Sequence, residues 1–116
     1  QGDIKKLTKE EKNLAKDAKN YMDRMYSRDI RIQDVAGILH VHPNYLSTLF
    51  RREYDQSPRE YLRKVRMNQA KLLLATTEYS ISDISSDVGY TNPFQFSKVF
   101  KSCYGISPTE YRNMRQ

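Results

Sequence analysis

The sequence contains one cysteine, two histidines and no tryptophan in 116 residues. A single cysteine excludes an internal disulfide, and Cys103 is expected to be a small buried hydrophobe beside Val99 and Phe100 on a helical stripe. His40 and His42 have no Cys, Asp or Glu cluster that would complete a metal site. We therefore expect them to be turn residues, and we expect neither a metal nor another cofactor.

Long apolar runs are missing as well. No stretch approaches the roughly 20 apolar residues that cross a bilayer, and residues 1–12 lack the hydrophobic segment of a signal peptide. We therefore expect a cytoplasmic protein without a membrane partner. The chain starts with Gln1 instead of methionine, which predicts a fragment of a longer protein with a missing domain on its N-terminal side.

The remaining composition is that of a small basic protein. With 38% hydrophobic residues, the chain can bury one modest core or two small cores that support each other. Its net charge of +6 favours an anionic partner such as a nucleic acid, although a basic surface alone does not identify one. No segment alternates as a strand does, so we expect an all-α fold.

One unit of the sequence occurs twice. Ile32 and Asp34 recur 49 residues later as Ile81 and Asp83, and beyond a turn the offset becomes 50 because the second copy is one residue longer. Seven of fifteen aligned positions are then identical, too many to assign to chance. The repeated residues are Ser47, Phe50, Tyr54, Ser57, Pro58, Glu60 and Tyr61, which recur as Ser97, Phe100, Tyr104, Ser107, Pro108, Glu110 and Tyr111.

The second copy has the pattern of a helix-turn-helix. Ser80 and Asp83 predict the capped start of a short helix, a turn follows at Gly89, and Phe96 and Phe100 mark the buried face of the next helix. Such a motif places its second helix in a DNA major groove, so the opposite face of this helix is the candidate site. The first copy repeats this order.

Further helices are expected around the two motifs. Thr8 and Glu11 predict a capped start for a bracing helix that ends near Ser27, and Pro58 predicts a long helix to about Ala75. The inward residues of the long helix are expected to include Leu62, Val65, Leu72 and Leu73. About seven helices result, divided into a linker remnant (1–7), a first helix-turn-helix subdomain (8–56), a linker helix (57–76) and a second subdomain (77–116).

These residues resemble the DNA-binding domain of the AraC/XylS family of bacterial transcription regulators. The similarity spans roughly residues 21–115 and is most specific between Ile84 and Tyr111, which include GYTNPFQFSKVFKSCYGISPTEY. The linker-helix pattern of the family is matched by Arg66, Ala70, Leu73 and Leu74, and its first motif by Leu46, Ser47, Phe50 and Arg51.

The resemblance implies two recognition helices in successive major grooves of double-stranded DNA. Because both helices belong to one chain, we expect the fragment to bind as a monomer. By position it assigns base reading to Asn44, Ser47 and Thr48, and to Phe94, Gln95, Ser97 and Lys98. Phosphate or groove-edge contacts fall to Arg51, Arg52 and Lys101. We add Arg63, which shares the polar face of the long helix with Arg59, Lys64 and Lys71. The family's effector or dimerisation domain is absent from this chain.

Two positions depart from the family pattern. His40 stands where a turn glycine is common, so we expect a left-handed turn kept at some strain. Arg31 occupies the cap position that Ser80 holds in the second copy.

Two other classes of function remain to be compared with DNA binding by what the residues offer. The alternative to DNA binding is a helical interaction module that docks on RNA polymerase or another regulator, and it would bind DNA without steep salt dependence. An enzyme is not expected, because no nucleophile, base and orienting residue occur together and no glycine loop is present. No catalytic residue is therefore assigned.

Overall fold

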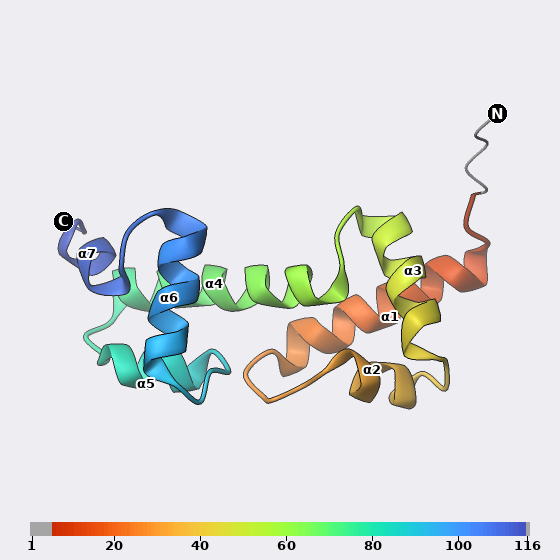
Figure 1. Ribbon diagram of the computed structural model, residues 1–116, viewed down its shortest axis with the longest axis horizontal. Helices are drawn as coiled ribbons and strands as arrows, with labels where there is room; N and C mark the ends of the chain where they lie inside the picture. Colours follow the sequence, from red (N-terminus) through yellow and green to blue (C-terminus); the bar gives the residue numbers. More distant parts are fainter. Residues whose placement is uncertain (1–5, 116) are drawn as a thin grey trace. The chain divides into compact units, whose positions relative to one another are not determined.

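The computed structural model describes residues 6–115, which form seven α-helices and no strand (Figure 1). This confirms the predicted all-α fold. None of the helices in this part of the chain is both long enough and apolar enough to cross a bilayer. The expected linker remnant at 1–7 falls mostly outside the described residues. The helices are α1 (Lys9–Met25), α2 (Ile32–Ile38), α3 (Pro43–Tyr54), α4 (Pro58–Thr76), α5 (Ile81–Asp87), α6 (Pro93–Tyr104) and α7 (Pro108–Asn113).

Local signals start several of these helices. At α1, the Thr8 backbone N–H donates to Glu11 (2.8 Å) and the Thr8 hydroxyl accepts from the Glu11 N–H (3.1 Å), as the predicted capping box requires. At α5, the Ser80 hydroxyl accepts from the Asp83 N–H (3.0 Å). Capping boxes also start α4 and α7, with the pairs Ser57–Glu60 and Ser107–Glu110.

The capping box of α7 gives the fold a pH dependence. The Ser107 backbone N–H, and then its hydroxyl, lower the pKa of Glu110 below 4.5. This contribution to stability is fully present above the unfolded pKa and is lost as the pH falls through the folded pKa. We expect Glu110→Gln to be less stable than the parent at neutral pH and equal to it at an acidic pH below the folded pKa of Glu110, as urea unfolding would measure. An equal loss at both pH values would exclude the charge as the cause.

The chain divides into two compact units. Within the described residues, unit 1 runs to Met25 and continues over Ile30–Leu62, whereas unit 2 comprises Tyr26–Asp29 and the chain from Arg63 onward. The boundary between Leu62 and Arg63 lies inside α4. Each unit therefore contains one of the two sequence copies and part of α4.

Unit 1 has its core where α1, α2 and α3 meet. The ring of Phe50 lies 4.8 Å from that of Tyr54 and 5.7 Å from that of Tyr61, centroid to centroid. These are normal separations for interacting aromatic pairs. The buried residues of this cluster are Ala18, Met22, Val35, Ala36, Leu46 and Phe50.

Unit 2 has an equivalent core built on α4, α5 and α6. Phe100 contacts the rings of Tyr104 at 4.7 Å and of Tyr111 at 5.7 Å, so α7 packs Tyr111 onto the second motif. The buried residues of this cluster are Met67, Ala70, Leu74, Ile84, Val88, Phe96 and Phe100.

Two predictions of burial were wrong. Leu72 is 54% exposed, whereas Ala70 and Leu74 are buried. Each residue turns the helix by about 100°, so Leu72, two residues from each of them, lies on nearly the opposite side of α4. Cys103 is also exposed. The packed row of α6 runs through Phe96, Phe100 and Tyr104, and Cys103 lies about 100° round the helix from Tyr104, on the side toward solvent.

Candidate nucleic-acid interface

The turn before each second helix has the same backbone design in both units. His40 adopts a φ of 60° and Gly89 a φ of 99°, so the predicted left-handed turn at His40 is confirmed. The next helix is capped by His42, whose Nδ1 accepts from the Asn44 N–H at 3.1 Å, and in the second copy by Asn92. His42 thus has the turn role expected from the sequence. Both turns direct the chain into a helix that starts with proline.

Helix α3 presents the predicted residues of the first motif on one side. Its opposite side is buried through Leu46, Leu49 and Phe50. Asn44, Thr48, Arg51 and Arg52 are exposed and Ser47 is half-buried. The Thr48 hydroxyl donates to the Asn44 carbonyl at 3.0 Å, so its proton is already engaged and its oxygen lone pairs remain as acceptors.

Helix α6 presents its residues in the same way. Phe96 and Phe100 are buried, whereas Gln95, Lys98 and Lys101 are exposed and Ser97 is half-buried. Phe94 is 86% exposed, which is unusual for a large apolar side chain that packing could have covered. Its exposure at the start of α6 is what we expect of a side chain that contacts a binding partner.

Arg63 differs from the other predicted site residues because it lies on α4. Its side chain is exposed and belongs to unit 2. Lys71, on the same helix, sits over the rings of Tyr104 and Tyr111 at 4.7 and 5.9 Å. Of the four basic residues predicted on the polar face of α4, Arg59, Arg63 and Lys64 are therefore exposed, and Lys71 is already engaged inside unit 2.

The basic C-terminus is also engaged within unit 2. Arg112 donates to the carbonyls of Leu74 (3.4 Å) and Thr77 (3.3 Å), and Arg115 donates to the same two oxygens at 2.7 Å. Arg115 also pairs with Glu78. The two guanidinium groups thus donate hydrogen bonds to carbonyls at the C-terminal end of α4, where positive charge is favourable.

Tyr45 was not assigned a role from the sequence, although the repeat aligns it with a predicted base-reading residue. It corresponds to Gln95 at the offset of 50, and it is 44% exposed on α3. Its hydroxyl donates to Glu11 at 3.4 Å, so the start of α1 lies beside the first recognition helix. The Thr8 backbone N–H lowers the pKa of Glu11, and this keeps a negative charge there.

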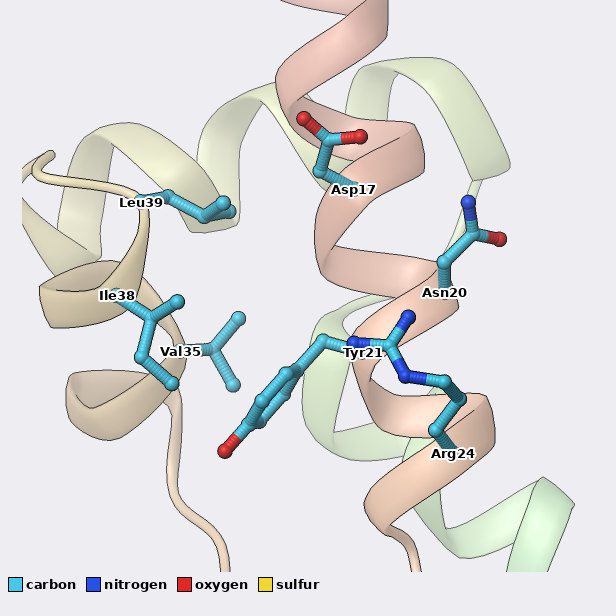
Figure 2. Close-up of a pocket in the computed structure, with 7 residues that line it drawn as sticks. All are labelled: Asp17, Asn20, Tyr21, Arg24, Val35, Ile38 and Leu39. Atoms are coloured by element: carbon cyan, nitrogen blue, oxygen red, sulfur yellow. The ribbon is translucent and has the colours of Figure 1, made fainter.

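A hollow of about 200 Å³ lies in unit 1 between α1 and α2 (Figure 2). Tyr21, Val35 and Ile38 contribute apolar side chains, and Asp17 and Arg24 stand on α1 at its edge. Pockets for small molecules usually measure about 300–1,000 Å³, so this hollow does not indicate a ligand site. Within residues 6–115, no three His, Cys, Asp or Glu side chains are grouped as a metal would require.

Comparison with known proteins places this geometry in a family. A family model described as "Helix-turn-helix domain" matches residues 35–114. The raffinose operon transcriptional regulatory protein RafR of Pediococcus pentosaceus is 38% identical over 109 residues, which are 94% of this chain and 38% of that protein. The arabinose operon regulatory protein of Escherichia coli is 37% identical over 101 residues, which are 86% of this chain and 35% of that protein.

A solved structure shares the same arrangement. The C-terminal domain of AraT, a response regulator from Geobacillus stearothermophilus, matches with a TM-score of 0.87 at 36% identity and covers 89% of this chain and 86% of that one. The chain spans about a third of the length of the curated relatives it matches. The similarity thus extends over most of this chain and over only one part of those regulators.

Proposed function

The chain belongs to the AraC family of transcription regulators as a helix-turn-helix DNA-binding domain, and from this premise we propose that it places α3 and α6 in successive major grooves of one operator. The members it matches are regulators and not enzymes. We also propose that the chain binds as a monomer in the bacterial cytoplasm, because both recognition helices are already present in one chain.

One observation carries this proposal: α3 and α6 are buried in the same register and expose equivalent positions. Leu46 and Phe50 are buried in α3, as Phe96 and Phe100 are in α6, at the repeat offset of 50. If only the buried positions of the repeat had been kept, the exposed residues of the two helices would not share the same chemical type. Here both outer faces carry exposed polar and basic residues: Asn44, Thr48 and Arg51 on α3, and Gln95, Lys98 and Lys101 on α6.

The exposed side chains have the chemistry that base reading requires. Lys98 can donate to guanine O6 and N7, Gln95 matches the edge of adenine, and Phe94 can pack on a thymine methyl group. The first motif offers the shorter side chains of Asn44, Ser47 and Thr48, with Tyr45 beside them. We therefore expect stronger sequence preference under α6 than under α3.

Basic residues around both helices would fix the register on DNA. We assign phosphate or groove-edge contacts to Arg51 and Arg52 in unit 1 and to Arg63 and Lys101 in unit 2. Four phosphate contacts predict that the logarithm of the binding constant falls with the logarithm of salt concentration with a slope of about −3.6.

Selection of bound duplexes from a random pool tests the function directly. The selected operator should contain two half-sites centred about 34 Å apart on one face, both protected by a protein monomer in a footprint. The salt slope is measured on the same duplex. Protection of a single groove, or a complex that forms only as a protein dimer, contradicts the proposal. A flat salt dependence favours the alternative, a module that docks on RNA polymerase.

Two lysines of α6 should have different effects when replaced. Lys98 lies closer to the end of α6 that enters the groove, so Lys98→Ala should relax preference at one or two base pairs and cost about 1–3 kcal/mol on the selected operator. Lys101→Ala should weaken all duplexes similarly and reduce the salt slope by about one unit. Binding to selected and random duplexes at several salt concentrations separates the two roles. Equal losses on both duplexes for Lys98→Ala would remove it from the base-reading set.

A further inference from the structure

The segment Tyr26–Asp29 connects α1 to α2 along the chain but belongs to unit 2. The chain therefore passes between the units three times: after Met25, after Asp29 and after Leu62. Two of these passages flank a segment of only four residues. Unit 1 is joined to both ends of this segment, so the interactions that bind the segment to unit 2 also restrain unit 1.

Arg66 of α4 holds the segment through its backbone. Its Nε donates to the Tyr26 carbonyl at 2.9 Å and its Nη2 donates to the Arg28 carbonyl at 2.8 Å. The guanidinium also lies over the Tyr90 ring, 5.5 Å from its centroid. A planar guanidinium can make two such bonds at once, which an ammonium does less well. Burial lowers the pKa of Arg66, and Tyr90 and then Asp29 act in the opposite direction.

The turn at Gly89 is shaped to receive the same segment. A Cβ placed on Gly89 would lie 2.5 Å from the Tyr26 carbonyl oxygen and 2.8 Å from Arg66 Nε. In the first copy, His40 adopts the same left-handed turn with its side chain exposed. A φ near 60° therefore accepts a side chain at this turn, whereas at position 89 both the φ of 99° and the close approach of the Tyr26 backbone favour glycine.

We propose that Arg66 is a positioning residue for DNA recognition: by fastening Tyr26–Asp29 to unit 2, it restrains the two units and makes the protein select one spacing between half-sites. This inference rests on the proposed function of the two units. Without Arg66, the four-residue segment would be a flexible linker between the two units. The protein would then tolerate operators of different spacing.

The test compares operators in which one base pair is added or removed between the half-sites. Each base pair rotates the second half-site by about 34° and moves it by about 3.4 Å. The parent should bind these operators at least about tenfold more weakly than the selected one. Arg66→Gln should bind all three spacings within about threefold of one another, and Arg66→Lys should be intermediate.

Arg112→Gln is the matched control. Arg112 also donates through Nε and Nη2 to two backbone carbonyls of unit 2, but these belong to Leu74 and Thr77 and not to the short segment. It should lower thermal stability and leave the spacing preference unchanged. If Arg66→Gln keeps the parent's spacing preference, Arg66 is only structural and the proposal is wrong. If Arg66→Gln does not fold, the spacing preference of Arg66→Lys is compared with that of the parent instead.

A measurement without DNA separates this inference from the proposed function. Spin labels on Cys103 in unit 2 and on Lys16→Cys in unit 1, both exposed positions, report the distribution of distances between the units. The distribution should broaden with Arg66→Gln and not with Arg112→Gln. An unchanged width overturns the role of Arg66, whereas a parent that binds no duplex specifically overturns the proposed function alone.

Discussion

An alanine inserted between Leu62 and Arg63 is expected to reduce affinity for the two-half-site operator by about 100-fold or more, or at least about 2.7 kcal/mol. The insertion rotates the helix beyond it by about 100° and advances it by only about 1.5 Å, so rotation is the damaging change. The position is the unit boundary: Leu62 packs on the core of unit 1, and the core of unit 2 begins with Met67. An insertion near Asn68 would disturb that second core.

Single half-sites provide the control for this insertion. Duplexes with only one half-site should bind the variant as they bind the parent, since neither recognition helix has changed. Helicity by circular dichroism and the thermal unfolding midpoint should stay close to the parent values. A folded variant that still protects both half-sites with parental affinity would show that α4 is a flexible tether, and the assignment of a spacing role to this helix would fail.

Replacing Gly89 by alanine is expected to destabilise the protein by about 2–5 kcal/mol. Two costs add. The backbone has a φ of 99°, a conformation that residues with a Cβ adopt at a penalty, and the new Cβ would collide with the Tyr26 carbonyl and Arg66. Since the carbonyl is backbone, the clash cannot be relieved by a side-chain rotation. Chemical denaturation measures the loss.

Gly105 supplies the matched control within the same unit. It also has a positive φ, 82°, but nothing lies within 4 Å of a Cβ built there. Gly105→Ala should therefore cost only the backbone term, about 1–2 kcal/mol. The difference between the two variants measures the close approach at Gly89. Equal losses would mean that Tyr26–Asp29 does not press on the turn, which would also weaken the role given to Arg66.

The helix starts and turns were predictable because their causes are local. The Thr8–Glu11 box and the proline at the start of α4 act within one turn of helix, and the structure confirms both. The left-handed turn at His40 followed from comparison with Gly89 in the second copy. The outer faces of α3 and α6 were also predictable, since a buried stripe at helical spacing fixes the opposite side.

Errors arose where several apolar residues adjoin and only packing selects among them. Leu72, Leu73 and Leu74 are consecutive, so they point about 100° apart, and periodicity alone does not say which one meets a neighbour. The core of unit 2 buries Leu74 and leaves Leu72 in solvent. Cys103 was misplaced for the same reason, because Tyr104 takes the contact with Phe100.

The sequence by itself determined that this protein is all-α, that it contains one helix-turn-helix unit twice, and which face of each second helix is exposed. Those properties depend on residues three or four apart and on a repeat that can be read directly. Only the tertiary structure joined Tyr45 to Glu11, 34 residues away, and Arg66 to the Tyr26 backbone, 40 residues away. Such contacts have no local signal, because backbone carbonyls are present at every residue and only the fold decides which one a buried arginine meets.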